Sequence, residues 1–166
     1  SDEVALDDAE PGKGPVNARQ MNLGRTLSVV CFDNVADTAA AERFHLEALT
    51  TALLEHPNIT PVHGYQALPD GRQIMEIQEI RGRPWEVILT EQKDLTKVSL
   101  NDKLDNLNAI CDALAFAHSR GILHAGLTPE RVMIGQFGEI LVGGWSQAIR
   151  LPNAPPHLSD LRSPAG

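Results

Sequence analysis

Apolar residues recur with the period of an amphipathic helix in two segments of the chain. In the first segment, residues 36–55, two rows of apolar residues follow the i, i+3, i+4, i+7 spacing of a helix with a buried face. The rows are Phe44, Ala48 and Ala52, and Leu46, Leu49 and Leu53. Asp37 or Thr38 stands just before them and is suited to cap the helix. The pattern predicts a helix over this segment.

The second helical segment is longer and covers residues 100–119. Its apolar stripe consists of Leu100, Leu104, Leu107, Cys111 and Leu114. Gly121 follows and is a typical helix stop. We expect the stripe to face inward, which would bury Cys111 on the inner face of the helix.

Runs rich in β-branched and other apolar residues indicate strands elsewhere. Residues 59–67 and 72–80 are two extended runs joined by Leu68-Pro69-Asp70-Gly71, in which Pro fixes φ and Gly accepts a positive φ. Residues 132–134 and 140–142 form a smaller hairpin around Gly135-Gln136-Phe137-Gly138. A short helical run is expected at 85–90, after Pro84.

Charge and composition narrow the class of protein. The net charge is −8 and the basic residues are scattered, which argues against a nucleic-acid partner. Hydrophobic residues make up 42% of the chain, enough for a core. No apolar run approaches membrane-spanning length and no signal-peptide pattern opens the chain, so a cytoplasmic protein is expected. Cys31 and Cys111 are interpreted as buried thiols of a reducing compartment.

Residues 118–150 resemble the active site of a protein kinase in which the catalytic residues are replaced. The kinase catalytic loop reads H-R-D-L-K-P-x-N, whereas residues 124–131 read HAGLTPER. The D-F-G position reads GWS at residues 144–146. Upstream, residues 24–32 resemble the kinase β3 strand, and residues 56–59 (HPNI) resemble the junction after the kinase C-helix. The resemblance identifies the chain as similar to bacterial serine/threonine kinases, in the form of a pseudokinase.

The resemblance implies which functional groups are lost. The phosphate-binding lysine falls at Val30, the catalytic aspartate at Gly126 and the loop lysine at Thr128. The two Mg²⁺ ligands fall at Arg131 and Gly144, neither of which offers the side-chain oxygen that Mg²⁺ requires. The chain is therefore expected to lack kinase activity, a metal site and a cofactor.

Other kinase positions are retained or degraded. The C-helix glutamate is retained as Glu47, which is expected to be either solvent-exposed or paired with Lys13, Arg19 or Arg131. His124 is expected to bond backbone near the D-F-G turn, and Trp145 to pack in the core. Weak candidates for nucleotide contacts remain in a shortened glycine-rich element and at the hinge: Gly12, Lys13, Gly14, Gln78 and Ile80.

The implied fold is α+β and kinase-like. Residues 11–80 would form a small lobe, with a five-stranded antiparallel sheet and the C-helix. Residues 81–150 would form part of a helical large lobe, with the kinase D- and E-helices and the catalytic-loop hairpin but without the C-terminal helices. Residues 1–10 would be an acidic tail and residues 151–166 a Pro/Ser-rich tail.

Three functions are compatible with this interpretation. The first is an inactive pseudokinase that serves as a protein-binding scaffold or regulatory subunit, with partners on the C-helix and the 100–119 stripe. The second is a module that senses nucleotides without hydrolysing them, in which Lys13 and Arg131 contact phosphates. The third is a structural subunit whose partner completes the truncated lobe.

Overall fold

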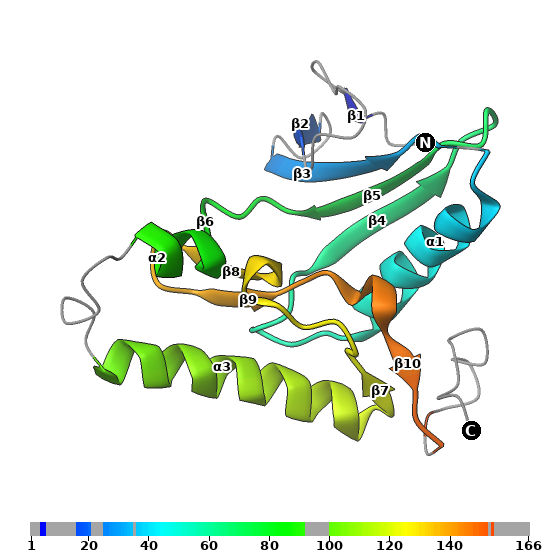
Figure 1. Ribbon diagram of the computed structural model, residues 1–166. Coiled ribbons are helices and arrows are strands. Elements are labelled where there is room, and N and C mark those ends of the chain that lie inside the picture. Colours follow the sequence, from blue (N-terminus) through cyan, green and yellow to red (C-terminus); the bar gives the residue numbers. More distant parts are fainter. Residues whose placement is uncertain are drawn as a thin grey trace.

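The computed structural model describes residues 4–5, 16–20, 25–34, 36–91, 100–152 and 154, with the first 25 residues described by backbone only. The upper layer is a five-stranded antiparallel sheet. Its spatial order is β1 (Val4–Ala5), β2 (Val16–Gln20), β3 (Arg25–Phe32), β5 (Gln73–Gln78) and β4 (Val62–Ala67) (Figure 1). Val4 and Ala5, in the segment predicted to be a tail, pair with β2.

The turn between β4 and β5 has the predicted chemistry. Leu68 N donates to Arg72 O at 2.8 Å, and Gly71 adopts a φ of 89°. Asp70 Oδ1 accepts from the backbone N–H of Arg72, and Asp70 Oδ2 from its guanidinium. The turn fixes the register in which Met75 of β5 stands opposite Tyr65 of β4.

Helix α1 (Thr38–Leu53) packs below the sheet (Figure 1). Asp37 is its N-cap, because its side chain accepts from Ala40 N at 2.9 Å. The prediction of the buried face was wrong in part: Leu49 and Leu53 are 42% and 40% exposed. The buried residues are Ala48, Thr50 and Thr51. The helix contacts β4 and β5 on one side and the segment around Trp145 on another, so small and hydroxylated side chains are the ones buried.

The lower layer combines two helices with two small antiparallel sheets. Helices α2 (Trp85–Glu91) and α3 (Leu100–Ser119) lie near the regions predicted to be helical. A sheet of order β6–β8–β9 consists of β6 (Gly82–Pro84), β8 (Val132–Gly135) and β9 (Ile140–Val142). Strand β7 (Ile122–Leu123) pairs with β10 (Ile149–Arg150). Between these two strands the chain forms two short 3₁₀ turns, η1 (Pro129–Arg131) before β8 and η2 (Trp145–Gln147) after β9.

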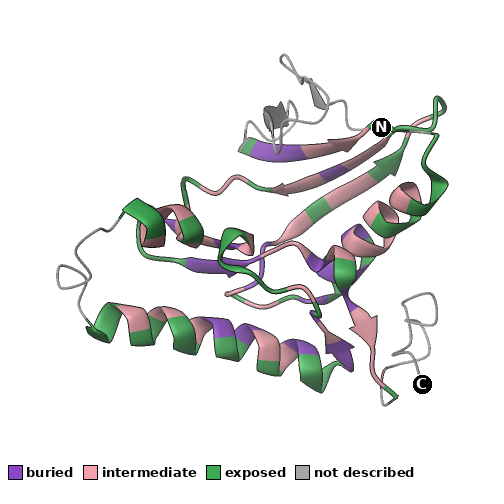
Figure 2. Ribbon diagram, viewed as in Figure 1, coloured by how far each residue is buried: buried purple, intermediate pink, exposed green. Residues whose placement is uncertain are grey.

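The predicted inner face of α3 was wrong in part: of its stripe, Leu114 packs against the core and the other residues do not. The core face is formed by Ile110, Ala113 and Ala117. Leu100, Leu104 and Leu107 are 69%, 48% and 45% exposed, and Cys111 is exposed as well. Cys31 is only partly buried, so neither cysteine is a fully buried thiol. Figure 2 shows α3 with exposed residues along its length and buried ones toward its C-terminal half.

Helix α1, the segment that follows it and the lower layer share one hydrophobic core and a backbone link. Leu54, Ile59, Val142 and Trp145 belong to this core. Thr60 N donates to Val142 O, and Val142 N donates to Asn58 O. The segment after α1 is therefore joined to β9, which holds the layers around the space between them.

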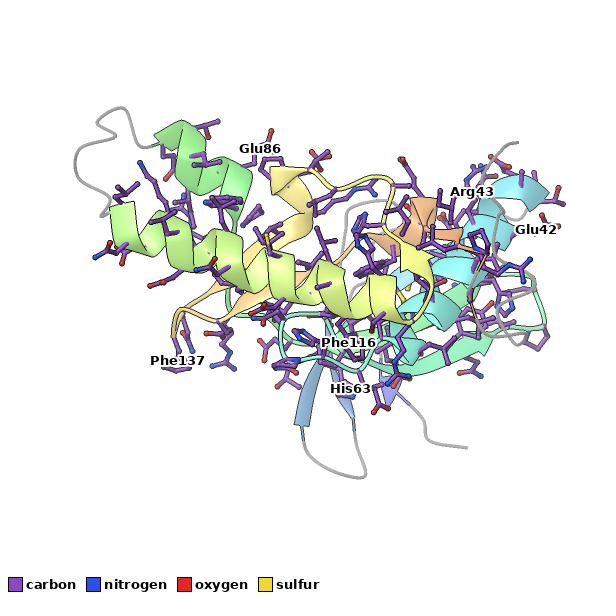
Figure 3. All side chains as sticks on the ribbon, turned by 90° about the horizontal axis from the view of Figure 1, so that it is seen from below. Glu42, Arg43, His63, Glu86, Phe116 and Phe137 are labelled. Carbon is purple, nitrogen blue, oxygen red and sulfur yellow. The ribbon has the colours of Figure 1, made fainter. Side chains whose placement is uncertain are left out.

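Two further surface features complete the fold. Phe137 is 86% exposed at the tip of the β8–β9 hairpin, where Figure 3 shows it projecting away from the ribbon. Leu151 N donates to Gly121 O, so Leu151 lies beside the end of α3. Within the described residues, no helix is both long and apolar enough to cross a membrane.

Candidate functional site at the cavity between the two layers

A cavity of about 520 Å³ lies between the sheet, α1 and the β8–β9 hairpin. Side chains of β3, β4 and β5 line one wall, and α1 contributes a second wall. The floor is formed by residues 130–133 and by Gly143 and Gly144. Among the described residues, three ionisable side chains line the cavity: Glu47, Glu130 and Arg131.

Arg131 and Gly144 form the centre of the floor. Arg131 ends the η1 turn, and its Nη1 donates to Gly144 O at 2.7 Å. Gly144 adopts a left-handed conformation (φ 71°, ψ 47°), which residues with a side chain rarely adopt. A Cβ placed on Gly144 would lie only 2.7 Å from Arg131 Cδ. The arginine side chain therefore occupies the space next to Gly144 where a side chain would begin.

Gly126 stands on the other side of the same arginine. A Cβ on Gly126 would lie 2.9 Å from Arg131 Nη1 and 2.8 Å from Gln147 Oε1. An aspartate at either glycine would need Arg131 to move. Gly126 and Gly144, which the sequence presents as separate replacements, thus both lie beside the side chain of Arg131.

Glu47 projects from α1 into this cavity. Burial raises the pKa of the Glu47 carboxyl, while the charge of Arg131 and a backbone hydrogen bond from Trp145 act in the opposite direction. Arg131, one of the cations that the sequence offered as its partner, acts on Glu47 through its charge. Lys13 and the side chain of Arg19 lie outside the described residues.

His124 holds the turn beneath Arg131. Its Nε2 lies 3.0 Å from Gly143 O, and its Nδ1 accepts from Gly126 N at 3.3 Å. Burial lowers the pKa of His124, as does the charge of Arg131, whereas the bond to Gly143 raises it. The neutral ring packs on Trp145 with centroids 4.4 Å apart. Trp145 is 1% exposed and donates from Nε1 to Val142 O, in a core position.

The remaining predicted site residues fall into three groups: those that line the cavity, one that is exposed, and those that lie outside the described residues. Val30, Gln78 and Ile80 line it. Thr128 is exposed, with its hydroxyl 3.4 Å from Glu130 Oε1. Gly12, Lys13 and Gly14 lie outside the described residues.

The donor set of the cavity does not fit a nucleotide–Mg²⁺ complex. Mg²⁺ requires oxygen ligands, and the floor presents a guanidinium between two glycines. Across the described parts of the chain, no group of three or more His, Cys, Asp or Glu side chains could hold a metal ion. Val30 provides no charge for a phosphate from β3. The described lining of the cavity can therefore enclose a small molecule, and its two carboxylates, Glu47 and Glu130, have no third ligating side chain beside them that would complete a metal site.

Sequence reasoning missed two residues of the site. Ala125 adopts a φ of 56°, which is uncommon for a residue other than glycine. Gln147 reaches the region above Gly126 from the η2 turn. No local pattern marks either residue, because each depends on how the segments around Gly126 and Trp145 meet in space.

The mixed helices, the small antiparallel sheets and the similarities below fit part of a protein-kinase-like fold. No protein-family model matches the chain. The chain is 32% identical over 154 residues to serine/threonine-protein kinase PknA of Mycobacterium tuberculosis, across 89% of this chain and 35% of that kinase. It is 32% identical over 124 residues to serine/threonine-protein kinase PknD of Protochlamydia amoebophila, across 69% of this chain and 12% of the kinase.

Serine/threonine-protein kinase PknD of Chlamydia trachomatis is 29% identical over 117 residues, across 65% of this chain and 12% of the kinase. The chain thus spans 35% or less of the length of each of these relatives. These similarities support a kinase-like relationship for the region that they cover.

Proposed function

We propose that this chain is a catalytically inactive, kinase-like module that binds a protein partner as a scaffold or regulatory subunit. The observation that carries the loss of catalysis is the position of Arg131 against Gly126 and Gly144. Kinases transfer phosphate by positioning and by neutralising charge with metal ions. Here a fixed cation fills the space in which the metal ligands would stand.

The inactivity is tested by phosphoryl transfer from ATP–Mg²⁺, both to the chain itself and to a generic protein substrate. Wild-type protein should incorporate no more phosphate than a Val30→Trp variant, whose indole would fill part of the cavity. Incorporation by wild type that is lost in Val30→Trp would overturn the proposal. Circular dichroism of both proteins establishes that they are folded.

The proposed partner surface is the exposed apolar stripe of α3. Leu100, Leu104 and Leu107 continue to Cys111 with alternating spacings of four and three, the seam pattern of helix–helix packing. On an ideal helix at 100° per residue, Asp105 and Asp112 form a row about 110–130° around the helix axis from the centre of this seam, and the half-buried Lys103 flanks the seam on its other side. Both aspartates are exposed and are separated by two turns, about 10.5 Å.

Charge selects the kind of partner that this surface fits. The exposed carboxylates of α3, Asp102, Asp105 and Asp112, disfavour a second copy of the chain, because the basic side chain of this helix, Lys103, is half-buried. A membrane surface with anionic lipids would also be repelled. An amphipathic helix with leucines at the 3–4 spacing and flanking Lys or Arg complements both the apolar seam and the acidic row.

The docking proposal is tested with synthetic peptides that share a leucine seam but differ in flanking charge. The lysine-flanked peptide should bind at least about tenfold more tightly than the glutamate-flanked peptide, and the difference should shrink in high salt. The double variant Asp105→Asn, Asp112→Asn should reduce the preference, whereas Glu86→Gln on α2 should not. Equal binding of both peptides, binding to anionic vesicles instead, or dimerisation through α3 would contradict the proposal.

A further inference from the structure

We propose that the cavity between the two layers binds an uncharged, flat and largely apolar molecule without a metal ion, in preference to any nucleoside triphosphate. Resemblance to kinases implies a nucleotide with bound Mg²⁺ in this cavity. The described lining residues do not fit that ligand, and the proposal starts from this mismatch. It concerns a ligand of the cavity, and the docking of a protein on α3 does not depend on it.

The size and lining of the cavity suit a small planar ligand. Its volume of about 520 Å³ lies in the usual range of small-molecule sites. Val30, Met75 and Ile77 project from the sheet side, and Met133 lies on the floor. A flat ring between these side chains would bury apolar surface on both faces. Val30 stands where kinases have their phosphate-binding lysine, so this wall is both apolar and uncharged.

Hydrogen-bonding groups near the floor are largely committed. Arg131 donates to Gly144 O, and Glu47 accepts from the backbone of Trp145. The hydroxyl of Thr51 donates to Glu47 O at 2.7 Å. A ligand that carries many acceptors, such as a phosphate chain, would have to break the Arg131–Gly144 bond to obtain a strong donor from this cation.

The charges of the lining disfavour an anionic ligand. Among the described lining residues, two carboxylates, Glu47 and Glu130, face one guanidinium, Arg131. With all three ionised, the formal sum over these side chains is −1. A triphosphate would add several negative charges to a lining whose described side chains already sum to −1 and hold no group of three or more metal-ligating side chains. An uncharged ring would leave the Glu47–Arg131 balance undisturbed.

The test compares adenosine, AMP and ATP by isothermal titration calorimetry, each with and without Mg²⁺. The three probes share one flat heteroaromatic ring and differ in the number of phosphates, so differences between their affinities measure the effect of the phosphates on binding. Adenosine should bind at least about tenfold more tightly than ATP, with AMP between them. Mg²⁺ should leave all three affinities unchanged.

Variants locate the binding and test the role of charge. Val30→Trp should abolish adenosine binding while the circular dichroism spectrum and cooperative unfolding remain. Glu130→Gln, which removes an exposed carboxylate at the rim, should strengthen ATP binding about threefold through weaker repulsion. Glu86→Gln, an exposed carboxylate on α2, is the matched control and should change neither affinity.

Three outcomes would overturn the inference. They are tighter binding of ATP than of adenosine, strengthening of ATP binding by Mg²⁺, and absence of adenosine binding to folded protein. A failure of this kind is distinguishable from a failure of the proposed function, which is measured by phosphoryl transfer and by peptide binding to α3. A folded protein that transfers no phosphate and binds no adenosine would refute the cavity proposal alone.

Discussion

At the scale of residues, the floor of the cavity is held by contacts among Gly126, Arg131 and Gly144. Each glycine leaves room for the arginine, which is bonded to Gly144 O. The identity of these three residues can be taken from the sequence, and their resemblance to kinase positions predicts what they lack. That both glycines lie beside Arg131 could not be predicted, because the η1 turn and the segment around Gly144 meet only in the folded chain.

The contact between Arg131 and Gly144 can be measured by a double-mutant cycle. Gly144→Asp should destabilise the protein by about 1–3 kcal/mol, since it combines a left-handed conformation with a clash against Arg131 Cδ. In the background of Arg131→Ala the same substitution should cost less, because the clash is removed. Urea unfolding gives the four free energies. Equal costs in both backgrounds would contradict the proposed coupling.

The buried carboxyl of Glu47 makes stability depend on pH in a defined direction. Its pKa is raised above the ordinary value of 4.5, chiefly by burial, so the folded state binds this proton more tightly than the unfolded state does. The ionised group therefore costs stability at neutral pH, and the cost disappears as pH falls through the raised pKa. Gln retains an oxygen that can accept from Trp145 but carries no charge.

Glu47→Gln should therefore unfold at a higher urea concentration than wild type at pH 7, with the difference vanishing by about pH 4. Glu86→Gln serves as an exposed control and should follow the wild type throughout. A loss of stability at pH 7 in Glu47→Gln would mean that attraction to Arg131 outweighs burial, contrary to this account.

At the scale of elements, the sequence predicted the regular segments better than their faces. The helix expected over 36–55 is observed as Thr38–Leu53, and the one over 100–119 as Leu100–Ser119. The faces were missed because apolar spacing shows that a stripe exists but not which neighbour covers it. Strands β6, β7 and β10 were also missed, since segments of two or three residues carry no readable period.

The two faces of α3 should respond differently to truncation. Ile110→Ala should cost about 2–4 kcal/mol because Ile110 is 5% exposed within the core. Leu104→Ala should cost less than about 1 kcal/mol, since Leu104 is 48% exposed. Chemical denaturation measures both. A large loss for Leu104→Ala with little for Ile110→Ala would mean that the core face of α3 has been assigned wrongly.

At the scale of the whole molecule, two layers enclose a cavity whose outline is kinase-like and whose chemistry is different. The layers are joined through Thr60, Val142 and Asn58, so the cavity belongs to the fold itself. The exposed seam of α3 lies on the lower layer, away from the five-stranded sheet (Figure 1). A ligand in the cavity and a protein on α3 could therefore be bound at the same time.

The central claim is that Arg131 occupies the place of the metal ligands, and paramagnetic NMR tests it most directly. Mn²⁺ would be added to ¹⁵N-labelled protein together with a non-hydrolysable ATP analogue. The account predicts no selective broadening of the backbone amides of Gly126, Arg131 and Gly144 relative to exposed sites. Selective broadening of these three amides at low Mn²⁺ concentration would place a metal ion in the cavity and contradict the account.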